Sequence, residues 1–310
     1  MKDLKVVFMG TPEFAGVILN KLIENVNVCL VVTQPDKEVG RKKEVKYSCV
    51  KEIAINHHID VFQPTKIRSD YQRIIDANPD IIITCAYGQI IPKELIMYPR
   101  LGCINVHASL LPKLRGGAPI HKAIIDGEEK TGITIMYMDE HMDTGDIISM
   151  EEYIIKDSDN VGILHDELSK IGADLLIKTL PSIIDGTNNR IKQDDTKATY
   201  AYNIKREEEH LDFNKTGKEI INQIRGLNPW PVANLIINDL EYKVYEAYFE
   251  KKSINEVGKV LDIKKDAIGI SCKDGIVYIT EIKPFGKKKM KVLDYLNGID
   301  KTNLINQSVN

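Results

Sequence analysis

Short apolar runs alternate with amphipathic stretches along the first part of the chain, and this alternation constrains the fold more than any other feature. The apolar runs predict strands at 4–10, 26–34, 80–88 and 103–108. The amphipathic stretches have helical spacing at 12–25, 50–59 and 160–186. Strands that are separated by helices form βαβ units and a mainly parallel sheet. We therefore expect an α/β, Rossmann-like domain over residues 1–189, with binding sites at the carboxyl ends of its strands.

The pattern changes in the second part of the chain. Residues 190–206 are polar with little periodicity, which predicts a linker between two domains. A helix is predicted at 216–227, and the segments that follow it are short and alternate in hydropathy. Asp274-Gly275 separates two of these segments and indicates a β-hairpin. We expect residues 207–310 to form a second, all-β domain, a small barrel.

Composition bounds the class of protein. The chain has 310 residues, 43% hydrophobic and 28% charged, which is typical of a soluble globular protein. Its net charge of −3 does not indicate a nucleic-acid partner, although a local basic patch would be enough to bind one. The five cysteines are scattered without a C-x-x-C pair, which favours a reducing compartment over a disulfide framework. We see neither a signal peptide nor an apolar span, so a cytoplasmic protein that does not enter membranes is expected.

Two polar side chains end the apolar run at 103–108. Residues alternate faces along a strand, so Asn105 and His107 become neighbours on one face at the carboxyl end. Burying them costs stability unless they are paired or face a cleft. Together they offer an amide donor and an imidazole that titrates near neutral pH. The alternative is a pair of hydrogen-bonded core residues, but the tight turn Ser-Leu-Leu-Pro that follows favours a site.

A carboxylate partner stands downstream in Met-Asp-Glu-His-Met-Asp-Thr-Gly-Asp, residues 138–146. Asp143 lies where a loop leaves the predicted strand 132–138. If that strand neighbours 103–108, Asp143 can reach His107 and set its tautomer. The acidic residues of this loop are also open to interpretation as a cation site. The loop lacks the glycine and the terminal glutamate of a calcium hand, so we expect no metal.

Two basic clusters, at 40–46 and 283–291, are either solvated charge or arms that hold phosphates. The glycine-containing turn after the first strand does not match a dinucleotide motif, because Gly10 and Gly16 do not make G-x-G-x-x-G. This broken pattern argues against a nicotinamide-dependent dehydrogenase.

Residues 102–120 together with 138–148 resemble the folate-dependent formyltransferases, which share Asn-x-His, Ser-Leu-Leu-Pro and Asp-Thr-Gly in this order. Further stretches resemble the members of that family that act on initiator tRNA: FMGTPEFA at 8–15, TQPDKEVGRKK at 33–43, AYGQIIP at 86–92, NPWP at 228–231 and GKKKM at 286–290. The resemblance implies a Rossmann-like catalytic domain and a C-terminal, OB-like tRNA-binding domain. It implies an enzyme of translation initiation that moves a formyl group from 10-formyltetrahydrofolate to the α-amino group of methionine on initiator methionyl-tRNA.

The resemblance also assigns residues. The catalytic trio falls on Asn105, His107 and Asp143. The folate-binding turn falls on Ser109, Leu110, Leu111 and Pro112. The loop that probes the tRNA falls on 35–46, with Arg41, Lys42 and Lys43. The chain departs from the family pattern at His141-Met142, where Gly-Leu is common before Asp-Thr-Gly.

Two other classes stay open at this point. A formyltransferase acting on a small amine, such as a glycinamide nucleotide or an amino-sugar nucleotide, would use the same trio but would not need a separate barrel and a basic arm. A non-catalytic RNA-binding protein would leave the trio without a role. No assembly motif is visible, so a monomer is expected.

Overall fold

The computed structural model describes residues 1–39 and 44–310, which form two compact units. Unit 1 comprises Met1–Pro119, Thr131–Tyr153 and His165–Tyr202. Unit 2 comprises Ile120–Lys130, Ile154–Leu164 and Asn203–Asn310. The segment 190–206, for which the sequence predicts a linker, therefore lies mostly inside unit 1.

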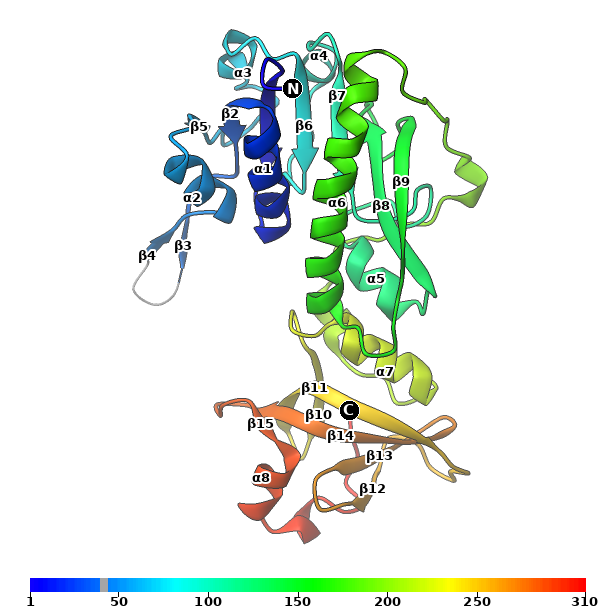
Figure 1. Ribbon diagram of the computed structural model, residues 1–310. Helices are drawn as coiled ribbons and strands as arrows, with labels where there is room; N and C mark the ends of the chain where they lie inside the picture. Colours follow the sequence, from blue (N-terminus) through cyan, green and yellow to red (C-terminus); the bar gives the residue numbers. More distant parts are fainter. Residues whose placement is uncertain (40–43) are drawn as a thin grey trace. The chain divides into compact units, whose positions relative to one another are not determined.

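The described part of unit 1 is built on a seven-stranded sheet (Figure 1). The strands follow one another across the sheet in the order β5 (Val61–Phe62), β2 (Asn27–Val32), β1 (Lys5–Gly10), β6 (Ile81–Cys85), β7 (Cys103–His107), β8 (Lys130–Tyr137) and β9 (Ile147–Ile154). The pairs from β5 to β7 are parallel, whereas β8 runs antiparallel to β7. The predicted mainly parallel, Rossmann-like sheet is thus confirmed. A short hairpin of β3 (Lys37–Val39) and β4 (Glu44–Lys46) stands outside this sheet.

Helices cover both faces of the sheet. They are α1 (Glu13–Asn25), α2 (Cys49–Asn56), α3 (Gln72–Asp76), α4 (Lys93–Ile96) and α6 (Val161–Ile184). Helix α6 packs closely on the sheet at Gly172, where an added Cβ would lie 3.1 Å from Cγ1 of Val106 and 3.3 Å from Cδ1 of Ile18. The opposite face packs against α3 and α4, in an apolar cluster that includes Ile74, Leu95 and Cys103. The alternation along β7 therefore sends Val106 to one layer and Cys103 to the other.

Unit 2 contains an antiparallel sheet in the order β10 (Ala233–Ile237), β11 (Leu240–Lys251), β14 (Gly275–Pro284), β13 (Ile268–Cys272) and β12 (Val260–Ile263). The short strand β15 (Met290–Lys291) pairs with β14 and leads into α8 (Val292–Asn297). The predicted hairpin joins β13 to β14, because Cys272 pairs with Gly275. The turn itself is Lys273-Asp274, so Gly275 opens the strand, where a Cβ would lie 2.2 Å from the carbonyl oxygen of Glu250.

The last residues of the chain close this sheet into a barrel. Val309 bridges to Ile237 in the edge strand β10, and Ser308 bridges to Lys259 beside the other edge strand, β12. Paired hydrogen bonds between Ile236 and Asn310, at 2.6 and 3.0 Å, hold the first of these contacts. Satisfying both open edges with one segment removes the unpaired backbone groups that edge strands otherwise expose. An all-β barrel was predicted, and its closure by the C-terminal residues is the feature that the sequence does not indicate.

Two earlier segments of the chain belong to the same unit and contact α7 (Gly217–Gly226) and the residues just before it. Nη1 of Arg225 donates to the carbonyl oxygens of Lys156, Asp157 and Asp159, each at 2.9 Å. Lys122, in α5 (Pro119–Ile125), forms an ion pair with Glu208 at 2.5 Å. Unit 2 therefore includes contributions from 120–130 and 154–164 as well as from residues beyond 203. Within the described residues, no helix is long and apolar enough to cross a membrane.

Candidate active site

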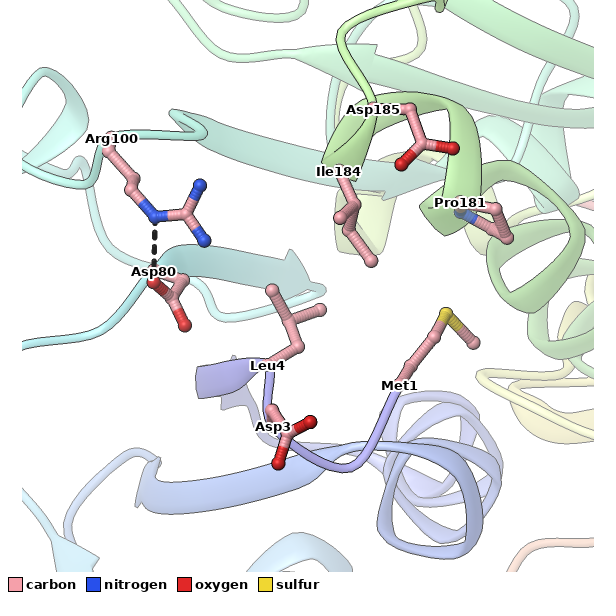
Figure 2. A pocket seen from close by; sticks show the side chains of 8 residues that line it. All are labelled: Met1, Asp3, Leu4, Asp80, Arg100, Pro181, Ile184 and Asp185. Carbon is pink, nitrogen blue, oxygen red and sulfur yellow. Dashed lines mark hydrogen bonds and ion pairs between the residues drawn. The ribbon is translucent and has the colours of Figure 1, made fainter.

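Two features stand at opposite ends of the strands of unit 1. A pocket with a volume of about 340 Å³ lies where β1 and β6 begin, lined by Met1, Asp3, Leu4, Asp80, Arg100, Pro181, Ile184 and Asp185 (Figure 2). Nε of Arg100 donates to Oδ1 of Asp80 at 2.8 Å, so these two charges neutralise each other. Its lining contains neither an imidazole nor a thiol nor a hydroxyl side chain. Open α/β sheets bind ligands at the carboxyl ends of their strands, which directs attention to the far end of β7.

Asn105 and His107 stand at that carboxyl end. Asn105 is half-buried, and the side chain of His107 is only 6% exposed. The hydroxyl of Thr84, in the neighbouring strand β6, has one hydrogen to donate and lies 2.9 Å from Oδ1 of Asn105, its nearest acceptor, and 3.1 Å from the carbonyl oxygen of Ile104. An amide oxygen only accepts and an amide nitrogen only donates. Because the oxygen of Asn105 faces the hydroxyl of Thr84, its NH₂ group is left to offer as a donor.

The imidazole of His107 has a defined tautomer in its neutral form. Its Nε2 lies 3.1 Å from the carbonyl oxygen of Leu114, which can only accept, so Nε2 carries the hydrogen. The lone pair of the neutral ring is therefore on Nδ1. Nδ1 lies 3.8 Å from Oδ1 of Asp143, so the carboxylate does stand near the imidazole. The expectation that Asp143 sets the tautomer is wrong, because the carbonyl oxygen of Leu114 sets it. A proton taken up at Nδ1 would face a carboxylate.

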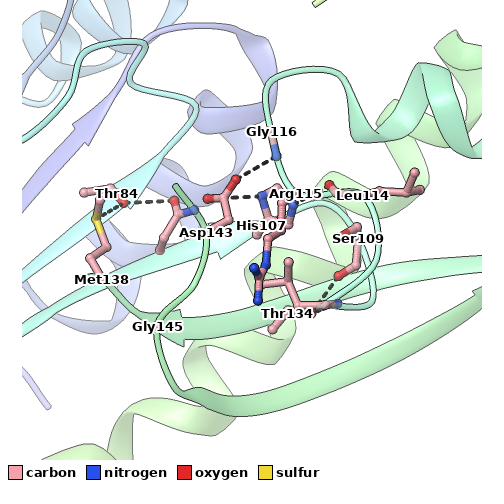
Figure 3. A network of polar contacts seen from close by, with 12 residues as sticks. Thr84, His107, Ser109, Leu114, Arg115, Gly116, Thr134, Met138, Asp143 and Gly145 are labelled. Carbon is pink, nitrogen blue, oxygen red and sulfur yellow. Dashed lines mark hydrogen bonds and ion pairs between the residues drawn. The ribbon is translucent and has the colours of Figure 1, made fainter. Parts of the chain in front are cut away.

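Asp143 reaches this position by an indirect route. Because β8 runs antiparallel to β7, its carboxyl end, Tyr137, lies beside Ile104 and not beside His107. The loop 138–146 runs back and turns at Asp143, whose φ of 56° is in the left-handed region. The backbone N–H of Gly116 donates to Oδ2 at 2.8 Å, so the carboxylate lies between Gly116 and His107 (Figure 3).

The Ser-Leu-Leu-Pro turn is fastened to β8. The hydroxyl of Thr134 donates to the carbonyl oxygen of Ser109 at 2.6 Å and accepts from the N–H of Leu111 at 3.2 Å. Ser109 is fully buried and its hydroxyl donates to the carbonyl oxygen of Lys113 at 2.7 Å, while Leu111 is 3% exposed. Leu110 and Pro112 are half-buried. Of the four residues that the resemblance assigns to folate, only these last two present substantial side-chain surface.

The segment after residue 190 contributes residues that the sequence analysis missed. Oγ1 of Thr199 accepts from the N–H of Leu114 at 2.9 Å, and Arg115 exchanges backbone hydrogen bonds with Thr199 and Ala201. Gln193 bonds to the loop of Asp143 and to Arg115. These contacts come from a polar segment without periodicity, and no local pattern in the sequence predicts them.

Cys103 shares the face of Asn105 but is unsuited to act as a nucleophile. Its side chain is buried, and burial raises the pKa of the thiol far above neutral. Its sulfur lies 3.5 Å from that of Met138. The thiol is therefore protonated at neutral pH.

The acidic residues of the loop 138–146 are engaged separately. Oδ1 of Asp139 accepts from the hydroxyl of Thr144 at 2.7 Å, and Asp146 pairs with Arg190 at 3.1 Å. Among residues 1–39 and 44–310, no group of three His, Cys, Asp or Glu side chains is arranged to hold a metal ion.

The predicted tRNA-contacting residues Arg41, Lys42 and Lys43 lie outside the described residues. The base of that arm is anchored at Asp36, which accepts from Lys51 at 2.5 Å and from Gln63 at 2.8 Å. The Lys51 ammonium and the Gln63 amide outweigh partial burial and lower the pKa of the Asp36 carboxyl.

The formyl transferase family model matches residues 4–180, and the model of the formyl transferase C-terminal domain matches residues 203–300. The chain belongs to the formyl transferase family. The methionyl-tRNA formyltransferase of Staphylococcus epidermidis is 50% identical over 301 residues, covering 96% of this chain and 97% of that protein. The same enzyme from Staphylococcus aureus is 49% identical over 302 residues, with the same coverage of both chains.

Solved structures share the formyl transferase fold. The N-formyltransferase from Helicobacter canadensis, in complex with folinic acid and dTDP-3-aminofucose, superposes with a TM-score of 0.67 at 22% identity, covering 94% of this formyl transferase and 100% of that chain. HypX from Aquifex aeolicus, in complex with tetrahydrofolic acid, superposes with a TM-score of 0.63 at 17% identity, covering 95% of this chain and 47% of that chain. At 22% and 17% identity, these two superpositions show that the fold is shared and nothing further.

Proposed function

We propose that this formyl transferase moves a formyl group from 10-formyltetrahydrofolate to the α-amino group of methionine on initiator methionyl-tRNA. The observation that carries the proposal is the identity of about 50% to methionyl-tRNA formyltransferases along 96% of the chain. The protein would act in the cytoplasm, as a monomer, at the initiation of translation.

Asn105 would stabilise the charge that develops on the formyl oxygen. Attack of an amine on a formyl carbon leaves negative charge on that oxygen, and a donor placed beforehand stabilises it more than a mobile one. The amide oxygen of Asn105 faces the hydroxyl of Thr84, so the amide nitrogen would be the atom that donates to the reacting carbonyl. Removing one such donor typically costs ~10²–10³ in rate.

His107 and Asp143 would manage the proton. The attacking amine must be neutral and must lose a proton as the new C–N bond forms. Nδ1 of His107 carries the lone pair, because Nε2 donates to Leu114. The distance of 3.8 Å between Nδ1 and Oδ1 of Asp143 is too long for a direct hydrogen bond. A water molecule or the attacking amine could lie between these two atoms, and the proton of the amine could then reach Nδ1 directly or through that water. Asp143 would then stabilise the imidazolium.

The folate co-substrate would bind beside this trio. It supplies the activated formyl group, and as the bond from the formyl carbon to N10 breaks, N10 would take up the proton lost by the amine, so that the folate leaves as tetrahydrofolate. Leu110 and Pro112 are half-exposed beside the carboxyl end of β7, on a turn that Thr134 holds in place. We propose that these two side chains contact the co-substrate. Ser109 and Leu111, buried and bonded internally, would shape the turn.

The arm at 35–46 and the C-terminal region 207–310 would bind the tRNA. Arg41, Lys42 and Lys43 would contact phosphates near the acceptor end, and such contacts release counterions and weaken as salt rises. Arg41→Ala should therefore raise the KM for methionyl-tRNA and leave folate binding unchanged.

An amino-sugar nucleotide is the competing acceptor, because sugar N-formyltransferases share the fold. The test supplies 10-formyltetrahydrofolate with methionyl initiator tRNA, uncharged initiator tRNA, or a dTDP-amino sugar, and detects N-formyl products by mass spectrometry. Formyl-methionyl-tRNA as the only product supports the proposal. Product from the amino sugar with none from methionyl-tRNA would overturn it.

A further inference from the structure

Asp143, Gly116, Arg115 and Gln193 form a closed ring, joined by hydrogen bonds and by the peptide bond between Arg115 and Gly116. The carboxylate accepts from the backbone N–H of Gly116 at 2.8 Å. The preceding residue, Arg115, sends its guanidinium to Oε1 of Gln193, with Nε at 3.1 Å and Nη2 at 2.8 Å. Nε2 of Gln193 donates to the carbonyl oxygen of Asp143 at 2.8 Å, which completes the ring. Asp143 is therefore held at both its side chain and its backbone.

The amide of Gln193 has one possible orientation in this ring. Its oxygen faces a guanidinium, which only donates, and its nitrogen faces carbonyl oxygens, which only accept. The second N–H of the same nitrogen donates to the carbonyl oxygen of Gly145 at 2.8 Å. One side chain thus grips the backbone on both sides of Thr144. Turning the amide over would replace each attractive contact with a repulsive one.

The other member of the ring is equally fixed. The side chain of Arg115 is 2% exposed, and Asp195 accepts from its Nη2 at 2.7 Å. Its backbone N–H donates to Thr199 at 2.9 Å, and its carbonyl oxygen accepts from Ala201 at 2.7 Å. A buried guanidinium that is paired on several sides makes a rigid support for Gln193.

Asp143 needs such support because its backbone is in the left-handed region, with φ at 56°. A residue other than glycine persists in that region where surrounding contacts fix it. The turn is also constrained at Gly145, where a Cβ would lie 1.9 Å from the carbonyl oxygen of Tyr137.

From this ring we infer that Gln193, supported by Arg115, is a positioning residue that fixes the Asp143 carboxylate beside the imidazole of His107. The inference rests on the proposed function for its kinetic consequence, and on the contacts alone for its structural one. Gln193 would touch neither the formyl group nor the amine. It would act through the loop 138–146, in which a displacement of about 1 Å at a reacting group can cost ~10²-fold in rate.

Two substitutions of Gln193 separate its hydrogen bonds to the loop 138–146 from its hydrogen bonds with Arg115. Gln193→Glu keeps an oxygen for the guanidinium but loses both N–H donors and faces the two carbonyl oxygens with negative charge. Gln193→Met keeps the length of the side chain and loses every hydrogen bond. Gln72→Met is the matched control, because Gln72 is exposed on α3 and bonds only to the neighbouring turn, at Asp76, among the contacts identified for it.

The kinetic readout is kcat for formyl transfer, with the KM for 10-formyltetrahydrofolate measured beside it. Both Gln193 variants should lose between about 10- and 100-fold in kcat while the KM stays within about twofold. The Gln72→Met protein should match the wild type. Wild-type kcat in Gln193→Glu would overturn the inference, because it would show that the contact with Arg115 suffices.

The structural readout is hydrogen exchange at the amide of Gly116, which the carboxylate of Asp143 protects. Exchange there should accelerate in both Gln193 variants and not in Gln72→Met. Unchanged exchange in Gln193→Met would overturn the inference. The exchange measurement needs no turnover. If the wild-type protein failed to formylate methionyl-tRNA, the proposed function would be refuted, and the exchange data would still decide the role of Gln193.

Discussion

The carboxylate of Asp143 lies 3.8 Å from Nδ1 of His107, although the strands that lead to these residues run in opposite directions. The contact exists because the loop 138–146 doubles back to the carboxyl end of β7. Loop contacts and not strand pairing therefore set this distance. Substitutions in the loop and its supports should alter chemistry while leaving the sheet intact.

Asp143→Asn tests the charge of this carboxylate. Asparagine keeps an oxygen for the N–H of Gly116 but cannot stabilise a protonated imidazole. We expect kcat to fall by about 10²–10⁴-fold, the range for loss of assisted proton transfer, with little change in the melting temperature. Asp146→Asn, which removes only an exposed ion pair with Arg190, is the control. Equal kcat values in the two variants would contradict the role given to Asp143.

Thr84→Val tests the support of Asn105. Valine has nearly the shape of threonine but lacks the hydroxyl that holds Oδ1 of Asn105. The amide is then free to turn its oxygen toward the reacting carbonyl, so kcat should fall by about tenfold or more, part of the ~10²–10³ that a full donor contributes. Thr84→Ser retains the hydroxyl and should keep most of the activity. Steady-state kcat values with methionyl-tRNA test both expectations, and a wild-type kcat in Thr84→Val would contradict the role given to Thr84.

Cys103→Ala tests for a covalent route. Burial raises the pKa of this thiol, so a thiolate nucleophile is not available at neutral pH. The variant should retain kcat within about threefold and lose stability by about 1 kcal/mol, because a small apolar contact is removed. Intact-mass spectra of the wild-type protein during turnover should show no added formyl group. A formyl adduct that vanishes in Cys103→Ala would contradict the direct transfer proposed here.

Asp80 makes part of the stability of unit 1 dependent on pH. The backbone N–H of Lys5 and the guanidinium of Arg100 hold the pKa of the Asp80 carboxyl below its usual range (Figure 2). A lowered pKa in the folded state adds stability that is fully present above the unfolded pKa of ~3.9 and is lost as the pH falls through the folded value. Asp80→Asn should therefore cost about 1–2 kcal/mol at pH 7 and less as the pH approaches 3.

Denaturant unfolding of both proteins at several pH values measures this difference. A deficit of the same size at pH 7 and pH 3 would mean that the charge of Asp80 has no part in it.

Local sequence rules identified most of the parallel core and the two polar residues of β7. Alternation along 103–108 was enough to put Asn105 and His107 on one face, because that rule depends only on strand geometry. The direction of β8 was not predictable, since hydropathy alternation is the same for a strand running either way. The sequence predicts Asp274-Gly275 as the turn of the β13–β14 hairpin, whereas the turn is Lys273-Asp274. Gly275 is already part of β14, where it lies close to the carbonyl oxygen of Glu250.

The remaining features depend on contacts that are distant in the sequence. Gln193 and Thr199 lie in a polar segment without periodicity, and their importance comes from hydrogen bonds to residues 48 to 85 positions away. The closure of the barrel by Ser308 and Val309 is similar, because these two residues form bridges to strands or segments that lie far away in the sequence.

The most direct test of the account is the single-turnover rate of formyl transfer to methionyl initiator tRNA by Asn105→Ala and His107→Ala proteins. Both variants should bind 10-formyltetrahydrofolate and melt within a few degrees of the wild type. Their rates should be lower by ~10²-fold or more, because each lacks a group that acts only as the new bond forms. A wild-type rate in either variant would contradict the assignment of the reaction to the carboxyl end of β7.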